Sequence, residues 1–169
     1  MSTTVTRVAL RAASFATIAL STAFSGAVGP PHITVRSVAA GMDAPAGAIL
    51  LIETKHHTDP ANLSVTGRAE GIVNGKRVST TLQFARQSLG HYSLTRQWQA
   101  GSPWILVLSA EQGPDGKHGV AEAIVKVDAS GTVNSIEYPA AGWVNRTEMP
   151  KRTSAADIDA MLSSMVARR

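Results

Sequence analysis

The chain has 169 residues, of which 44% are hydrophobic, 17% charged and 5% aromatic, and none is cysteine. This composition is typical of one globular domain and excludes a coiled coil, a collagen-like chain, a multi-span membrane protein and a largely disordered chain. Without cysteine the protein cannot form disulfides, thiolate zinc sites or a catalytic thiol. The formal net charge is +4, so the positions of the charges decide whether a polyanionic partner is worth considering.

Residues 1–27 have the pattern of a cleaved secretory signal peptide. Arg7 and Arg11 form a basic start, residues 12–28 carry no charge, and Ser25-Gly26-Ala27 offers the small residues that signal peptidase reads. The pattern predicts cleavage after Ala27, and the lack of an Arg-Arg pair favours general secretory export. We expect a periplasmic or extracellular protein, with no stable membrane span after cleavage. An uncleaved anchor is the weaker alternative.

The mature chain begins with alternating apolar residues, which predict β-strands. A first strand runs through Ile33, Val35 and Val38, and residues 40–47, rich in Gly and Ala, break it. The apolar run 49–52 predicts a central strand that is covered on both faces.

Four further strands are predicted, in two pairs separated by the turns at residues 74–75 and 99–103. Strands 63–73 and 76–84 flank Asn74-Gly75, a strong two-residue hairpin signal. The alternation continues through residues 90–98 and then 104–108, where Trp98 and Trp104 lie among leucines and are expected in the core.

Residues 120–127 and 132–138 form the last predicted hairpin. The total is about eight strands with no helical periodicity before residue 150. We therefore predict an all-β domain over residues 28–139, an immunoglobulin-like antiparallel β-sandwich of two sheets.

The end of the chain has a different pattern. Residues 140–152 have no clear periodicity, and Trp143 is the best candidate there for an exposed, partner-facing aromatic side chain. From Ser154 onward, apolar residues recur at helical spacing, and Asp157 follows Ser154 as in a capping box. Residues 140–169 are therefore predicted to be an irregular segment and a short amphipathic helix, which either docks on the sandwich or meets a partner.

Recognisable catalytic patterns are absent from the sequence. There is no Gly-x-Ser-x-Gly nucleophile motif, Gly75-Lys76 lacks the spacing of a phosphate-binding loop, and the twelve acidic residues stand in no catalytic motif. The sequence therefore favours a protein that is not an enzyme, with an enzyme of unrecognised type as the remaining alternative.

The histidines are the candidate metal ligands. His56, His57 and Asp59 lie within four residues, and His118 precedes a later strand. Imidazole and carboxylate groups suit copper or zinc. Adjacent residues of a strand point to opposite faces, however, so His56 and His57 cannot share one metal in regular β geometry. We expect no cofactor unless the protein handles metal.

The distribution of charge does not predict nucleic-acid binding. Arg7 and Arg11 leave with the signal peptide, and residues 146–169 hold five basic and three acidic residues. The predicted sandwich then carries nine basic and nine acidic residues and is neutral. The excess positive charge therefore belongs to the export signal and the C-terminal segment.

Two segments resemble a known group of domains. Gly90-His91-Tyr92-Ser93-Leu94 and Gly101-Ser102-Pro103-Trp104-Ile105-Leu106-Val107 are similar to the paired-strand signature of small exported bacterial immunoglobulin-like domains, such as the YtkA-like and copper-resistance-type sandwiches. With residues 66–77, they also resemble short secreted bacterial proteins of unassigned function. The resemblance implies the fold rather than an activity.

The copper-resistance resemblance also implies a candidate ligand. Asp115-Gly116-Lys117-His118 is similar to an Asp-Gly-His stretch in those sandwiches, with Lys117 inserted, and it nominates His118. The sequence as a whole favours a non-enzymatic exported binding or accessory module, whose partner is an unknown protein or small ligand. The alternative is a periplasmic copper-handling protein with His56, His57 and His118 as ligands.

Overall fold

The computed structural model describes residues 31–56, 59–113, 119–139, 142–144, 147–149 and 152–167. For residues 142–144 and 147–149 it describes the backbone alone. The predicted signal peptide, residues 1–27, lies outside the described residues, so its cleavage stays a prediction.

Sheet A contains five antiparallel strands. Its main path runs β1 (Pro31–Ser37), β2 (Ala48–His56), β7 (His91–Thr95) and β6 (Ala85–Ser88), and the short β3 (Asp59–Pro60) pairs with β2. Strand β2 is therefore central, as the apolar run 49–52 predicted.

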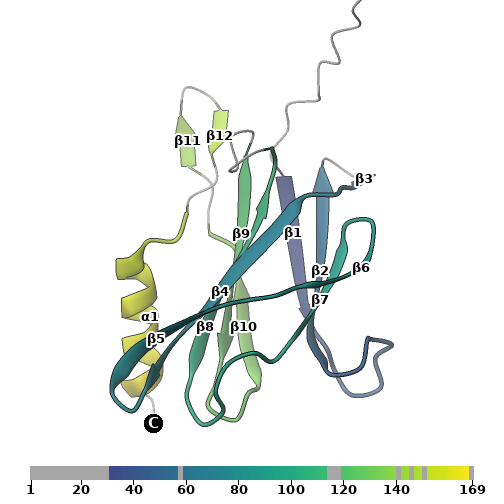
Figure 1. The fold of residues 1–169 in the computed structure, drawn as a ribbon. Coiled ribbons are helices and arrows are strands. Elements are labelled where there is room, and N and C mark those ends of the chain that lie inside the picture. The colour runs from purple at the N-terminus through teal and green to yellow at the C-terminus, as the bar shows by residue number, and fades with distance from the viewer. Residues whose placement is uncertain are drawn as a thin grey trace, which may run out of the picture.

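Sheet B is also antiparallel and five-stranded. Its order is β10 (Val133–Glu137), β9 (Val120–Val127), β8 (Trp104–Glu111), β4 (Ser64–Val73) and β5 (Lys76–Thr81). The predicted turn between β4 and β5 is confirmed, because Asn74 and Gly75 both adopt positive φ, at 51° and 75°. The two sheets make an all-β sandwich, with sheet B between sheet A and the C-terminal helix (Figure 1).

The described residues contain more strands than the eight expected. The additional strands in the sheets are β3, which has two residues, and β6, whose four residues are all exposed and show no alternation. The segment expected to be irregular also holds a small hairpin, β11 (Gly142–Val144) with β12 (Thr147–Met149). Strands this short or this polar leave no periodic signal in a sequence.

The main core lies between the two sheets. Alternate residues of the strands fill it, and among its buried side chains are Leu50, Leu94, Leu106, Leu108, Val125 and Val127. Trp98 and Trp104 are both buried there, as predicted. The Trp104 ring lies directly against Gly71: a Cβ at that position would stand 2.6 Å from Cε3 of the indole. Only glycine therefore leaves room for this ring.

The expectation that β2 is covered on both faces is wrong. Leu50, Ile52 and Thr54 are buried on the inner face, but Leu51 and Glu53 on the opposite face are only half-buried. The strand buried on both faces is β8, in which seven consecutive residues are buried. A run of apolar residues can identify a central strand, but a second covering layer exists only where another element packs.

The layer that covers β8 is the helix α1 (Ala155–Ala167). Its start is a reciprocal capping box: the Asp157 amide donates to Ser154 Oγ at 3.2 Å, and the Ser154 amide donates to Asp157 Oδ2 at 3.1 Å. A second buried cluster joins the helix to the outer face of sheet B, and it consists of Ile105, Val107, Ile124, Ile158 and Leu162. The docked arrangement of the helix is therefore confirmed.

Polar contacts surround this apolar interface. Glu122, which is buried on β9, accepts a hydrogen bond of 2.6 Å from the amide of Thr153. Arg77 on β5 forms an ion pair with Asp159 of the helix. These contacts tie the helix and the residues before it to the outer face of sheet B. No helix among the described residues has the length and hydropathy needed to cross a membrane.

Candidate functional site

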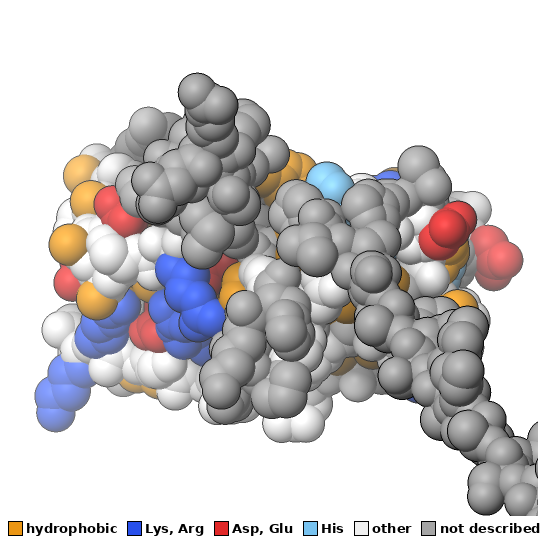
Figure 2. Space-filling view, turned by 90° about the horizontal axis from the view of Figure 1, so that it is seen from above, with side chains coloured by type: hydrophobic (Ala, Val, Ile, Leu, Met, Phe, Trp, Pro, Cys, Tyr) orange, Lys and Arg blue, Asp and Glu red, His pale blue; other side chains and the backbone are white. Residues whose placement is uncertain are grey.

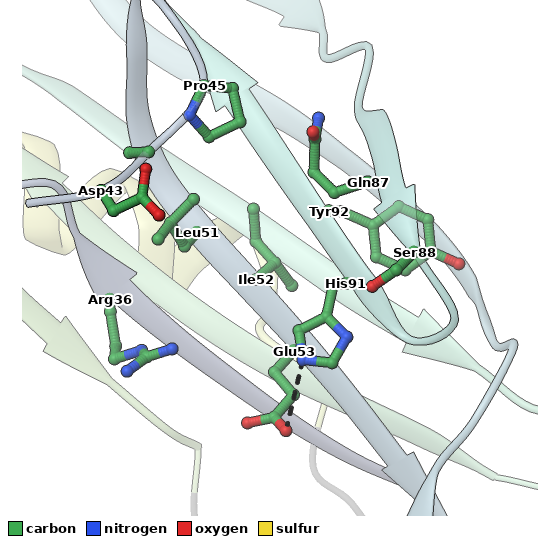
Figure 3. A pocket seen from close by; sticks show the side chains of 11 residues that line it. Arg36, Asp43, Pro45, Leu51, Ile52, Glu53, Gln87, Ser88, His91 and Tyr92 are labelled. Carbon is green, nitrogen blue, oxygen red and sulfur yellow. Dashed lines mark ion pairs between the residues drawn. The ribbon is translucent and has the colours of Figure 1, made fainter.

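The outer face of sheet A carries an open groove of about 450 Å³. Unlike the outer face of sheet B, this face has no helix packed on it in the described part of the chain (Figure 1). The groove, called the sheet A groove below, lies between the β1–β2 loop and strands β2, β6 and β7 (Figure 3). Its lining side chains include Arg36, Asp43, Pro45, Leu51, Glu53, Gln87 and His91.

The β1–β2 loop forms one wall of the groove. Gly41 and Gly47 adopt positive φ, at 81° and 73°, a conformation that a side-chain-bearing residue rarely takes. The Ala48 amide donates to the Pro45 carbonyl at 3.0 Å, which tightens the return into β2. Because of these turns, the loop residues Asp43 and Pro45 line the groove together with Leu51 of β2 (Figure 3).

Strand register places Arg36 and Glu53 on the same face. Arg36 of β1 is opposite Leu51 of β2, and Glu53 is two residues further along β2. Residues two apart on a strand share a face, and diagonal neighbours on adjacent strands are about 7–8 Å apart. The next residue on this face, Lys55, forms an ion pair with Glu53, Nζ to Oε1, at 3.1 Å.

His91 lies opposite Glu53 at the start of β7. Its Nδ1 is 2.8 Å from the Leu89 carbonyl oxygen, and since a carbonyl only accepts, Nδ1 carries a proton. The other ring nitrogen, Nε2, faces Glu53 Oε1 at 3.7 Å. The turn before it depends on Gly90, with φ of 70°, where a Cβ would approach the Thr54 carbonyl oxygen to 2.7 Å.

Two exposed charged groups of the groove have no partner among the described residues. Glu53 is paired with Lys55 and faces His91, but Arg36 and Asp43 make no hydrogen bond or ion pair within the described residues. These two charges are opposite in sign, and both border Leu51 (Figure 3). The groove can therefore offer a ligand one cationic and one anionic contact around an apolar floor.

A second hollow, of about 410 Å³, lies beside α1. Its two carboxylates are already engaged. Glu137 accepts hydrogen bonds from Lys126 Nζ at 2.5 Å and from Ser135, and the Lys126 bond is the main reason that the pKa of Glu137 is lowered. Asp157 is occupied by the capping box. This hollow therefore presents fewer free groups to a ligand than the sheet A groove.

Glu70 is the most heavily bonded acid on the outer face of sheet B. The side chain is buried, and it accepts hydrogen bonds from Arg68 Nε at 3.0 Å, Ser79 Oγ at 3.0 Å and Arg77 Nε at 3.3 Å. Arg77 continues this network to Asp159 of α1. All these groups are satisfied by one another, so the network positions the helix rather than a ligand.

Charges of both signs are mixed on the face seen in Figure 2. Seen from above the molecule, basic side chains gather on the side that carries α1, and acidic side chains lie directly beside them (Figure 2). This mixture agrees with the balanced charge of residues 28–145 in the sequence. A mixed surface attracts a polyanion weakly compared with a continuous basic patch.

The predicted metal ligands are placed only in part. His56 is half-buried at the end of β2, where it pairs with Pro31 and Asp59 in the strand register. His57 and His118 lie outside the described residues. Among the residues that are described, no group of three or more His, Asp or Glu side chains is placed to hold a metal ion. The metal prediction therefore stays a prediction. The separate prediction that Trp143 is an exposed, partner-facing aromatic also stays a prediction, because its side chain is not described.

The groove itself was not predicted from the sequence. Arg36 and Glu53 stand at outward positions of alternating strands, and His91 is the first residue of β7; polar residues at such positions are ordinary. The one local signal was the Gly-rich and Pro-containing loop at residues 40–47, because such loops carry binding residues more often than strands do.

Comparisons with known proteins leave the site without a precedent. No family model, no curated protein and no solved structure matches the chain. Function must therefore be argued from the groove and its chemistry.

Proposed function

We propose that this protein is an exported, non-enzymatic binding module that holds a small ligand in the sheet A groove. The observation that carries the proposal is the pair of oppositely charged side chains, Arg36 and Asp43, which have no partner among the described residues and lie beside the half-buried Leu51. The groove volume, about 450 Å³, falls in the range of small-molecule sites. A few placed polar groups around apolar side chains are also typical of such sites.

The geometry of His91 supports binding rather than hydrolysis. In a Ser-His-Asp triad, one ring nitrogen of the histidine bonds an orienting acid and the other bonds a nucleophile. In His91, Nε2 faces Glu53 and Nδ1 is bonded to the Leu89 carbonyl, so neither nitrogen is directed at a hydroxyl. The Ser93 hydroxyl is instead bonded to Gln87 Nε2 at 2.9 Å. Glu53 and His91 thus form a wall of the groove.

The order of the strands supports an immunoglobulin-like type for the sandwich. The path β1–β2–β7–β6 corresponds to strands A, B, E and D of that fold, and β9–β8–β4–β5 corresponds to G, F, C and C′. Domains of this kind commonly act through their surfaces and loops. Export as a secreted bacterial protein is part of the proposal, and the mass of the secreted chain tests it: the N-terminus should be Val28.

Binding in the groove can be tested by NMR on the ¹⁵N-labelled protein with four probes: glucose, citrate, spermidine and L-leucine. We expect at least one probe to shift the amide signals of residues 51–53 and 87–92. Leu51→Trp, which fills the floor, should abolish these shifts. His32→Trp is the matched control, because His32 is exposed on β1 and lies outside the groove lining.

The outcomes separate cleanly. Shifts that are lost in Leu51→Trp and kept in His32→Trp support a ligand site in the groove. The proposal is wrong if none of the four probes shifts the groove amides, or if Leu51→Trp leaves the shifts unchanged.

A further inference from the structure

We infer that the ligand of the sheet A groove is a small zwitterion, a molecule with one ammonium and one carboxylate group and an apolar part, of the size of an amino acid or a dipeptide. The inference rests on the proposed function, because it names the ligand class of the same groove. It follows from the signs of the unpaired charges, from the apolar floor and from the balance of charge around the groove.

Arg36 is the contact for the ligand carboxylate. It projects from β1 beside the floor, and the described residues give its guanidinium no acid to pair with. A guanidinium binds a carboxylate through two parallel hydrogen bonds, which suits a ligand whose anion is planar. Glu53 does not neutralise the Arg36 guanidinium, because the Glu53 carboxylate forms an ion pair with Lys55 at 3.1 Å.

Asp43 is the contact for the ligand ammonium. It lies on the β1–β2 loop near Leu51 and apart from Arg36 (Figure 3), and it too has no partner among the described residues. A carboxylate accepts hydrogen bonds only, and an ammonium donates three. Asp43 is therefore chemically matched to the end of a zwitterion that Arg36 cannot bind.

Leu51 and Pro45 supply the apolar contact. Both line the groove, and Leu51 is half-buried on the outer face of β2. An aliphatic side chain of the ligand would cover this exposed apolar surface, at about 25 cal/mol per Å² of area removed from water. A free amino acid and a dipeptide share this chemistry, and a volume of about 450 Å³ has room for either.

The balance of charge disfavours ligands of a single sign. Asp43 would repel a multivalent anion, and Arg36 would repel a multivalent cation, whereas Glu53 and Lys55 offset each other as an ion pair. A zwitterion meets one favourable contact at each end, so both unpaired groups of the protein become paired when it binds.

Isothermal titration calorimetry on the full chain tests the inference with L-leucine and with leucyl-leucine. Two modified probes each lack one charge: leucinamide has no carboxylate, and N-acetyl-leucine has no ammonium. We expect each modification to weaken binding about tenfold or more, the effect of losing one charge-assisted contact. The stronger of leucine and leucyl-leucine identifies the size of the ligand.

Crossed variants assign each contact. Arg36→Gln should weaken leucine about tenfold and leave leucinamide unchanged, whereas Asp43→Asn should weaken leucine and leave N-acetyl-leucine unchanged. The matched controls are Arg86→Gln and Asp59→Asn, since both residues are exposed and neither lines the groove. Neither control should alter binding.

Failure of this inference is distinct from failure of the proposed function. If citrate, spermidine or glucose shifts the groove amides, and neither L-leucine nor leucyl-leucine binds in the calorimeter, the zwitterion is wrong and the groove remains a ligand site. If leucine binds but the crossed variants behave like their controls, the assigned contacts are wrong. If no probe shifts the groove amides, both proposals fall.

Discussion

Truncation of Leu162 to alanine should detach α1 while the sandwich stays folded. Leu162 and Ile158 are the two fully buried side chains of the helix, each 1% exposed. Burial of two such side chains contributes roughly 3–6 kcal/mol, and a free 13-residue helix is only marginally stable in water. Leu162→Ala removes about 2–5 kcal/mol, which is comparable with the whole contribution of docking.

The loss of global stability is therefore limited to the free energy of docking. Once the helix detaches, no further penalty reaches the core between the sheets, because α1 packs on the opposite face of sheet B. A loss of about 2 kcal/mol in the free energy of helix docking corresponds to a roughly thirtyfold rise in the amide hydrogen-exchange rate. This rise should be confined to residues 155–167 and to the outer face of β8.

Two measurements on one sample separate the events. Amide exchange by NMR reports on the helix, and tryptophan fluorescence during urea unfolding reports on the core, where Trp98 and Trp104 are buried. Ser163→Ala is the control in the same helix, since Ser163 is exposed and its loss should change stability by less than about 0.5 kcal/mol. The reasoning is refuted if Leu162→Ala behaves like the control, or if helix and core lose protection equally.

Three further predictions concern the sandwich itself. Gly71→Ala should destabilise the fold by about 1–3 kcal/mol and change the emission of Trp104, because the new Cβ would stand 2.6 Å from the indole. Tyr138→Phe should cost about 1 kcal/mol and speed exchange of the Val35 amide, which donates to the Tyr138 hydroxyl at 3.0 Å. The hydrogen bonds of Asp128 lower its pKa, so it stabilises the fold above its ordinary pKa and the effect disappears as the pH falls through its lower folded value. Urea midpoints from pH 7 to pH 3 should therefore depend less on pH in Asp128→Asn.

Each of these predictions has its own check. Gly75→Ala imposes only the strain of a positive φ, with nothing within 4 Å of the new Cβ, so it should lower stability and leave the tryptophan emission unchanged. An unaltered Val35 exchange rate in Tyr138→Phe would show that water replaces the hydroxyl. Ser130→Ala removes the largest cause of the Asp128 pKa shift, the bond from Ser130 Oγ at 2.6 Å. If the pH dependence persists unchanged in both variants, another carboxyl carries it.

Much of the secondary structure followed from the sequence because it depends on local chemistry. Asn74-Gly75 can take positive φ at both positions, so the hairpin was fixed by two residues. Ser154 and Asp157 can each accept a hydrogen bond from the other's backbone amide, so the four-residue segment 154–157 determined where α1 begins. The inward and outward faces of the longer strands followed from a period of two residues, which placed Trp104 in the core.

The covering layers and the groove were decided only in three dimensions. Alternation separates the two faces of a strand but does not reveal which face another element will cover. For this reason β2 was expected to be buried on both faces, whereas β8 is the strand that is buried on both. The groove joins Arg36, Asp43, Glu53 and His91 through strand register and loop closure. Those long-range pairings depend on the packing of the whole sandwich. The turns and the helix cap depend only on neighbouring residues, so the sequence alone could predict them.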